Sequence, residues 1–380
     1  MSDGDTGPQK EPKPFDLLAL LAAFARDQGM ALDHPALVET FTADAVRRLK
    51  RALTDTALLH GSRTERLFEA TVLSLGNFRL LKAEDNGRIH ATGTLRAPDF
   101  RVVLDDGAQW LIEVKNVRRK DPFKQHTTMS AAYLGSLQAY ADMMGVPLRL
   151  AIYWSRWSLW TVIAPEHFRQ PNGSLRISMQ QGVIANKFSR LGEVSIMTRP
   201  PLRIVLGAAK DRPHGVGADS IASFIIGSVR LFSGEHELVD LRDRKLAEVL
   251  ISYGEWPLGG PFAMTDEHGF AGVQYVAEPE EATGQAFEGI GWASRIFSSF
   301  YADQTVEGDR IVQLLGQSAP EWFAPLADWD FDNSKLPLIL GRFEPNHALL
   351  QTTQAQPSGA KARKPHAGGG KRRTGQKRLA

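Results

Sequence analysis

The sequence contains no cysteine and no long apolar run. The lack of cysteine excludes disulfide frameworks, thiolate-ligated zinc, iron–sulfur clusters and a cysteine nucleophile. A membrane-spanning helix needs about 18 or more consecutive apolar residues, so we expect none here. Residues 1–14 are polar and lack the apolar core of a signal peptide. We therefore expect a cytoplasmic protein with no membrane contact.

The length and composition indicate a folded protein of more than one domain. A chain of 380 residues is long for one hydrophobic core, because single cores stop growing at roughly 250–300 residues. Hydrophobic residues make up 43% and charged residues 23%, which is ordinary for a soluble globular protein. The expected division is a disordered leader (1–14), a first domain (15–199, core 60–165), a second domain (200–356) and a disordered basic tail (357–380).

Positive charge is concentrated in the tail. The net charge is +2, and eight Lys and Arg residues follow Gln356 without any Asp or Glu, so residues 1–356 carry −6. A basic, glycine-rich segment without aromatic residues cannot bury a core. It is either an electrostatic arm for nucleic acid, in which Lys371, Arg372 and Arg373 would contact phosphates, or a solubilising tail.

Helical periodicity dominates the first 80 residues. A continuous apolar stripe predicts a helix over Phe15–Met30, followed by a break at Asp33-His34-Pro35. A second helix is expected from about Pro35 to Leu59 and a third from Gly61 to Gly76. Three helices therefore precede the first strand.

The middle of the chain predicts a sheet. The expected elements are strands over Phe78–Leu81, Phe100–Leu104 and Trp110–Val114, a helix over Thr127–Met144, and strands over Leu148–Trp154 and Trp157–Ile163. The order helix, strand, hairpin, helix, strand is typical of an α/β fold in which helices cover a mixed sheet.

The second half predicts an α+β domain. It contains strand candidates at Leu202–Leu206 and Phe270–Val276, and helix candidates at Asp219–Phe232, Leu238–Ile251 and Trp292–Phe300. We expect this domain to serve dimerisation or target recognition.

The second hairpin strand carries charge where burial is expected. Side chains alternate along a strand, so Glu113 and Lys115 share one face. The other face, with Trp110, Ile112 and Val114, is wholly apolar and should face the core. Burying a charged group is costly unless it is paired, which indicates a purpose for the charged face.

The hairpin register brings a second carboxylate to that face. A three-residue turn with Gly107 in the left-handed region pairs Leu104 with Ala108 and places Asp99 opposite Glu113. Directly opposed residues have Cβ atoms roughly 4.5–5.5 Å apart. Two carboxylates so close repel each other unless a cation lies between them. The pattern therefore predicts a Mg²⁺ site, which Mn²⁺ could also occupy.

A metal beside Lys115 suits phosphodiester hydrolysis. The metal would lower the pKa of a bound water and neutralise phosphate charge, while Lys115 would position the water or stabilise developing charge. The alternative is a surface hairpin with an ordinary cross-strand ion pair.

These residues resemble a known nuclease signature. Pro98-Asp99 followed by Glu113-Val114-Lys115 resembles the PD-(D/E)xK nuclease superfamily, over about residues 60–165. The resemblance implies a restriction-endonuclease-like mixed sheet flanked by helices. It also implies Asp99 and Glu113 as metal ligands and Lys115 as the catalytic lysine.

The same resemblance points to further site residues on the flanking helices. Gly61 followed by Glu65-Arg66 is similar to a pattern in Holliday junction resolvases and implies Glu65 as a third acid near the metal, with Glu69 as its competitor. RecB-like nucleases carry Gln on the next helix with Tyr four residues later. Here Tyr140 follows Gln138 by only two, so Gln138 is either an accessory residue or a surface glutamine.

The sequence thus favours a metal-dependent DNA endonuclease acting in restriction, phage defence or DNA repair. Nucleic acid would also contact a basic loop, Arg118, Arg119, Lys120 and Lys124. A non-catalytic nucleic-acid-binding protein and an RNA-directed nuclease are the alternatives. A homodimer is left open, and any NTP-driven step would need a separate ATPase or defence-system subunit, because no P-loop motif is present.

Overall fold

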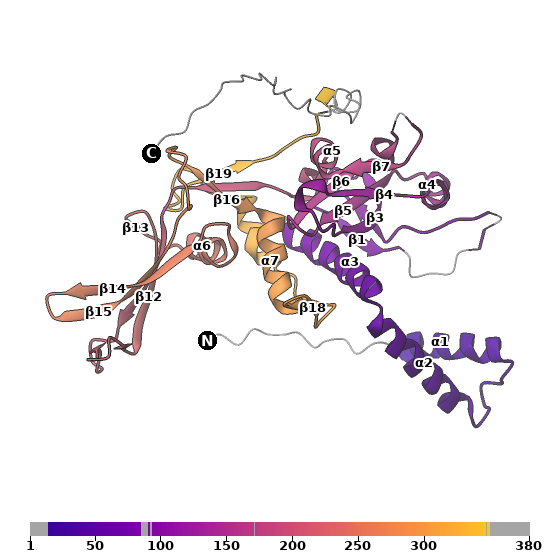
Figure 1. Ribbon diagram of the computed structural model, residues 1–380, viewed down its shortest axis with the longest axis horizontal. Coiled ribbons are helices and arrows are strands. Elements are labelled where there is room, and N and C mark those ends of the chain that lie inside the picture. The colour runs from indigo at the N-terminus through magenta and orange to yellow at the C-terminus, as the bar shows by residue number, and fades with distance from the viewer. Residues whose placement is uncertain (1–13, 85–89, 92, 171, 347, 350–380) are drawn as a thin grey trace, which may run out of the picture.

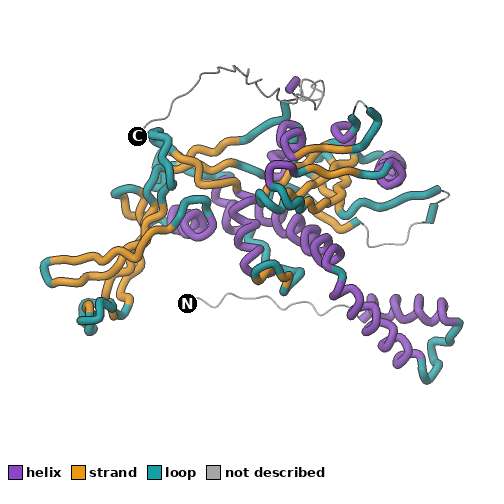
Figure 2. Tube along the Cα trace, in the orientation of Figure 1, coloured by secondary structure: helices purple, strands orange, loops and turns teal. Residues whose placement is uncertain are grey.

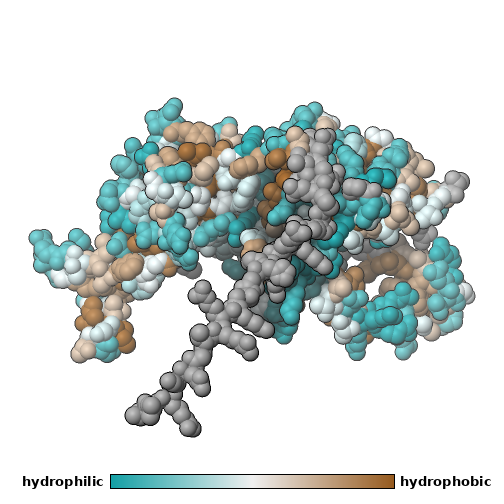
Figure 3. All heavy atoms as spheres, turned by 45° about the horizontal axis from the view of Figure 1, so that its top comes forward, coloured by the Kyte–Doolittle hydropathy of each residue, from teal (hydrophilic) through white to brown (hydrophobic). Residues whose placement is uncertain are grey.

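The computed structural model describes residues 14–84, 90–91, 93–170, 172–346 and 348–349. The predicted leader, apart from Pro14, and the predicted basic tail with Lys371, Arg372 and Arg373 lie outside these residues. None of the helices in the described ranges has both the length and the apolar character needed to cross a bilayer. Hydrophilic residues cover much of the face seen in Figure 3, with smaller apolar patches between them.

Helices are distributed along the whole described part of the chain (Figure 1). The α-helices there are α1 (Pro14–Gln28), α2 (Leu37–Thr54), α3 (Thr56–Leu75), α4 (Ala131–Met144), α5 (Met179–Ile184), α6 (Leu241–Tyr253), α7 (Ala293–Thr305) and α8 (Pro320–Phe323). The predicted helices at Phe15–Met30, Leu238–Ile251 and Trp292–Phe300 are confirmed as α1, α6 and α7.

The boundary between α2 and α3 differs from the prediction. The sequence predicted a second helix to Leu59 and a third from Gly61, whereas both helices meet at Asp55. The Asp55 carboxylate accepts a hydrogen bond from the Leu58 backbone N–H at 3.0 Å. Such a cap satisfies one of the unpaired donors at a helix start, so α3 begins there and contains Gly61 in its interior.

The first sheet has five strands in the order β1-β2-β3-β5-β6. Their bounds are β1 (Leu80–Ala83), β2 (Phe100–Val103), β3 (Gln109–Val117), β5 (Leu148–Trp154) and β6 (Leu159–Ile163). The pair β3–β5 is parallel and the other pairs are antiparallel. The sheet is therefore mixed, as the sequence predicted.

Helices cover both faces of this sheet. Leu67 and Phe68 of α3 belong to the same buried cluster as Ile112 of β3, while Leu137 of α4 clusters with Leu111. Neighbouring residues of β3 thus pack on opposite helices. This is the mixed sheet flanked by helices that the restriction-endonuclease-like resemblance implied.

The predicted hairpin register is confirmed. Phe100 pairs with Ile112 and the Leu104 N–H donates to the Ala108 carbonyl at 2.8 Å. Gly107 has φ +83°, the left-handed conformation that the three-residue turn requires. Continuing the pairing by one residue places Asp99 opposite Glu113.

Three other local predictions need small corrections. The strand expected at Phe78–Leu81 begins two residues later, at Leu80, and the strand expected from Trp157 begins at Leu159. Helix α4 begins at Ala131 rather than Thr127. Residues 126–128 instead form β4 (His126–Thr128), which pairs with β7 (Arg176–Ser178), a segment about 50 residues away.

The second half contains two larger sheets and the remaining short pairs. One has the order β13-β12-β9-β15-β14, the other β16-β8-β19. The strands are β8 (Ser195–Thr198), β9 (Leu202–Ala208), β10 (Gly215–Val216), β11 (Ala222–Ser223), β12 (Ile226–Ser233), β13 (His236–Glu237), β14 (Leu258–Asp266), β15 (Gly269–Ala277), β16 (Glu288–Trp292), β17 (Val306–Glu307), β18 (Arg310–Ile311) and β19 (Leu338–Gly341).

The helix predicted over Asp219–Phe232 is wrong. Its C-terminal part forms β12, which pairs antiparallel with β9 from Ile226↔Ala208 to Ser233↔Leu202. The segment is rich in β-branched Ile and Val, which fit a pleated sheet better than a helix. The strands predicted at Leu202–Leu206 and Phe270–Val276 are confirmed as β9 and β15.

The two halves share one apolar core. The cluster that contains Leu67 of α3, before the predicted division near residue 200, also contains Leu202 and Leu338, after it. Figure 2 shows helices lying between the two groups of strands. The Ala319 N–H donates to the Ser74 hydroxyl at 2.9 Å across this junction. Residues of the second half therefore support α3 directly.

A buried carboxyl group also joins the halves. Glu193, 4% exposed, accepts from the Ser294 N–H at 3.0 Å and from the Ser294 hydroxyl. Ser294 lies in the first turn of α7, so Glu193 caps that helix from another segment. Burial nevertheless raises the pKa of Glu193 to about 7.

We expect Glu193→Gln to flatten the pH dependence of stability. Native Glu193 holds its proton up to a higher pH than the unfolded chain does, so its contribution is fully present below about pH 4.5 and is lost as pH rises through about 7. A shift of this size corresponds to about 3 kcal/mol. Urea unfolding between pH 5 and pH 8 checks this, with exposed Glu267→Gln as control. An equally steep pH dependence in Glu193→Gln contradicts it.

Candidate active site

The β2–β3 hairpin assembles the two predicted metal ligands. Asp99 directly precedes β2, and its Oδ2 accepts a hydrogen bond from the Val114 backbone N–H at 2.6 Å. Because Val114 follows Glu113 in β3, this bond fixes the Asp99 carboxylate beside that of Glu113. The structure thus brings Asp99 and Glu113 together, as the register predicted.

Glu113 is almost completely buried, at 3% exposure. Its Oε1 accepts hydrogen bonds from the Lys115 ammonium at 2.5 Å and from the Tyr133 hydroxyl. Its Oε2 is buried and has no hydrogen-bond partner among the described residues. A buried carboxylate oxygen without a partner is costly, which favours a bound cation or an ordered water beside it.

Lys115 is held as a cation beside this carboxylate. Its Nζ donates to the Tyr133 hydroxyl at 2.7 Å and lies 4.8 Å from the centre of the Tyr133 ring. Burial lowers the pKa of Lys115, but the Glu113 charge and the hydrogen bonds to Glu113 and Tyr133 outweigh it, so the net pKa is raised. The ammonium is therefore protonated at neutral pH and can donate or stabilise negative charge.

The raised pKa of Asp99 reflects its burial and the closeness of the other carboxylates. Burial and, next, the Glu113 charge raise the pKa of Asp99 to about 7, with a further contribution from Glu65. The Val114 N–H and Lys115 lower it only in part. The cluster thus carries more negative charge than its own cation and donors neutralise.

The residues present fit a hard divalent cation. Across the described residues, no group of three or more His, Asp or Glu side chains is arranged to hold a metal ion. Mg²⁺ does not need such a cage, because it is usually held by one or two carboxylates and keeps several waters. The pair Asp99 and Glu113, with the unpartnered Glu113 Oε2, matches that donor set.

The two glutamates of α3 have different surroundings. Glu65 lies close enough to Asp99 to contribute to raising the Asp99 pKa. Glu69 forms an ion pair with Arg66 at 3.0 Å. Of the two competing candidates, Glu65 is thus the one whose charge acts on Asp99.

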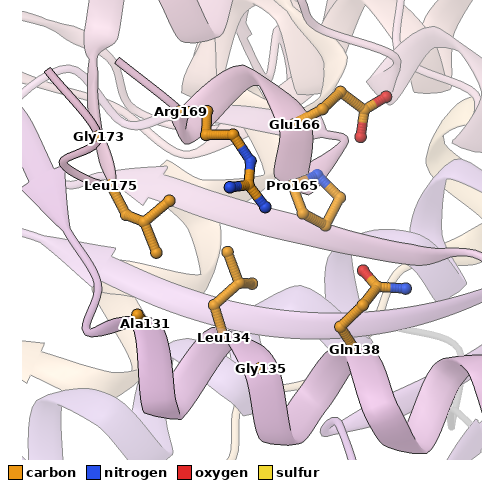
Figure 4. Close-up of a pocket in the computed structure, with 9 residues that line it drawn as sticks. All are labelled: Ala131, Leu134, Gly135, Gln138, Pro165, Glu166, Arg169, Gly173 and Leu175. Carbon is orange, nitrogen blue, oxygen red and sulfur yellow. The ribbon is translucent and has the colours of Figure 1, made fainter. Parts of the chain in front are cut away.

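Gln138 makes its side-chain hydrogen bond within α4. Its side-chain amide donates to Asp142 at 2.8 Å, and it lines a separate recess between α4 and the segment around Arg169 (Figure 4). Neither Asp99 nor Glu113 lines that recess. Tyr140 instead donates to Glu84 at 2.9 Å.

Three of the four side chains of the predicted basic loop make an ion pair or a hydrogen bond. Arg118 pairs with Asp309 at 2.7 Å, and Lys124 with Asp121 at 3.1 Å. The Arg119 Nε donates to the His126 carbonyl at 3.2 Å, and Lys120 is exposed. Arg118 thus turns toward the second half of the chain.

Sequence reasoning missed Tyr133. This residue lies in the first turn of α4, three residues after Ser130, which caps the helix. It contacts both Glu113 and Lys115, which are 20 and 18 residues away. No spacing rule in the signature pointed to it. The one available signal was an aromatic hydroxyl at the start of the helix after the charged strand.

Comparisons with known proteins give little further information. No protein-family model matches the chain, and no curated protein matches it. Among solved structures, the chain is similar to Hjc, a Holliday junction resolvase of Archaeoglobus fulgidus, at 17% identity and a TM-score of 0.27. The similarity covers 35% of this chain and 99% of that one. At this level it assigns neither a family nor an activity.

The Asp99 carboxyl should titrate near pH 7 in the metal-free protein. Replacing its charged neighbour by Glu113→Gln should lower that midpoint, because the second-largest cause of the shift is removed. Carboxyl ¹³C chemical shifts followed by NMR against pH measure this directly, with exposed Asp106 as internal control. An Asp99 midpoint near 4 in the wild type would show that the pair is not crowded.

Proposed function

We propose that this protein is a metal-dependent nuclease that hydrolyses phosphodiester bonds of DNA. The observation that carries the proposal is the pair of half-buried Asp99 and buried Glu113, which holds excess negative charge and an unpartnered oxygen beside the cation of Lys115. The resemblance of these residues to the PD-(D/E)xK signature supports the same chemistry. Restriction, phage defence and DNA repair all suit such an activity.

Asp99 and Glu113 would hold Mg²⁺ or Mn²⁺. When bound there, the ion would supply charge neutralisation for the phosphate and a water of lowered pKa. Lys115 is the nearest fixed cation, so it would orient the attacking water or stabilise the charge that develops on the phosphate oxygens. Since its pKa is raised, it acts as a donor and not as a general base.

Tyr133 is a positioning residue in this scheme. Its hydroxyl donates to Glu113 and accepts from Lys115, so it sets the direction of both side chains. Its pKa is raised, mainly by burial and by the bond to Glu113, so it remains a neutral donor. The guanidinium of Arg96 lies 4.7 Å from the centre of the Tyr133 ring and holds the ring in place.

Cleavage assays test the proposal. Supercoiled plasmid, linear DNA and RNA are incubated with the protein in Mg²⁺, Mn²⁺ or EDTA. We expect cutting of DNA only with metal, and a loss of about 10²-fold or more in Glu113→Gln and Lys115→Ala. The exposed substitutions Glu235→Gln and Lys82→Ala are matched controls. Wild-type turnover in either site variant refutes the site.

Other outcomes of the same assay select the alternatives. Cutting of RNA but not DNA would make the protein an RNA-directed nuclease. Binding without any cutting by the wild type would make it a non-catalytic nucleic-acid-binding protein. Cutting that persists in excess EDTA would rule out the metal. Circular dichroism melts of each variant show whether a loss of activity reflects unfolding.

Glu65→Ala should reduce activity more than Glu69→Ala. Glu65 acts electrostatically on Asp99, whereas Glu69 is neutralised by Arg66. The two residues lie one turn apart on α3, so each variant is the control of the other. Initial rates at several Mg²⁺ concentrations give the ranking. A larger loss in Glu69→Ala would transfer the role of third acid to Glu69.

A further inference from the structure

A second charged recess lies where the two halves of the chain meet. It is formed by the start of α3, the end of β3, the turn after β5 and the β17–β18 hairpin, and its volume is about 210 Å³. The charged or imidazole side chains of its lining are those of His60, Arg63, Arg118, Arg156 and Asp309.

The recess has an excess of positive charge. Three arginines face one carboxylate, that of Asp309, which leaves +2 with His60 neutral. Asp309 is already paired with Arg118 at 2.7 Å, and its side chain is 94% exposed. Burial, and then the charges of Arg118 and Arg63, lower the pKa of His60. The field in the recess is thus that of uncompensated cations.

Arg63 is a buried cation whose side-chain partners are uncharged. The residue is 8% exposed, and its Nε donates to the Thr305 hydroxyl at 2.8 Å. Its guanidinium lies 5.4 Å from the centre of the Tyr301 ring. Both of these partners are neutral. Burying a cation among neutral groups costs free energy that an anion in the recess would offset.

The recess and the proposed active site lie near the same end of β3 but on opposite faces of the sheet. Lys115 is followed directly by Asn116, which lines the recess, and successive side chains of a strand point to opposite faces. In α3, Arg63 precedes Glu65 by two residues, so these side chains also point in different directions. An extended polyanion that passes around the C-terminal end of β3 could reach both places.

We infer that this recess binds a backbone phosphate of the nucleic acid that the proposed nuclease cuts, at a distance from the phosphate that is hydrolysed. The inference rests on the proposed function. Guanidinium groups suit the task, because their planar donors match phosphate oxygens in pairs. Arg118 exchanges its bond to Asp309 for the phosphate, and Arg156 approaches from the turn after β5. Asp309 therefore competes with the ligand.

Binding of a labelled DNA duplex in EDTA, where no cutting is expected, tests this. Arg156→Gln should weaken binding about tenfold, as for one lost charged hydrogen bond. It should also reduce the slope of log K against log salt by about 0.9. Arg212→Gln, an exposed arginine outside the recess and outside the predicted basic loop, is the charge-matched control. Equal affinity and slope in Arg156→Gln and the wild type overturn the assignment.

Asp309→Asn should change duplex affinity in the direction opposite to Arg156→Gln. Removing the competing carboxylate frees Arg118, so duplex binding should tighten several-fold. A damaged fold would not produce such tightening. Glu307→Gln, in the same hairpin but outside the recess, is its control. Unchanged or weaker binding in Asp309→Asn counts against the inference.

Inorganic phosphate distinguishes a free anion from a nucleic-acid phosphate. Calorimetric titration of the wild type with phosphate should show only weak binding, because a single subsite lacks the rest of the duplex contacts. Tight phosphate binding that is lost in Arg156→Gln while duplex affinity is unchanged would assign the recess to free phosphate and overturn the inference.

The inference and the proposed function can fail separately. If the wild type does not cut nucleic acid but Arg156→Gln still weakens and Asp309→Asn still tightens duplex binding, the subsite stands without the nuclease. If cutting is normal and neither substitution alters duplex affinity, the nuclease stands without the subsite.

Discussion

The antiparallel pairing of β2 with β3 is the constraint on which the candidate site depends. Once Gly107 takes its left-handed conformation, every cross-strand pair of the hairpin follows, and Asp99 falls beside Glu113. Helices α3 and α4 then cover both faces of β3, so the carboxylates lose most of their hydration. A short turn thus determines both the position of the charges and the cost of burying them.

The surrounding groups offset that cost only in part. Lys115, the Tyr133 hydroxyl and the Val114 N–H each stabilise one carboxylate oxygen, yet Glu113 Oε2 has no partner among the described residues. A fully satisfied network would be better for stability alone. Sites that must take up a cation commonly retain such unbalanced charge, because the ligand then replaces the missing partner.

The parts that could be predicted from the sequence are those fixed by local geometry. The hairpin register, the placement of Asp99, Glu113 and Lys115 and most helices follow from turn chemistry and periodicity. The strand β12 could not be predicted, because its conformation depends on pairing with residues of β9 that lie 18 to 31 positions earlier. Tyr133 and Asp309 also escaped prediction, since only the tertiary fold brings them to the charged residues of the first sheet.

The single capping residue between α2 and α3 has a mechanical consequence. Helix α2 has 18 residues, so at about 1.5 Å per residue it is a lever about 27 Å long. Together with α1 it projects from the body of the molecule (Figure 1). Because no flexible linker separates it from α3, a force applied at the far end of the lever would turn the helix that carries His60 and Glu65.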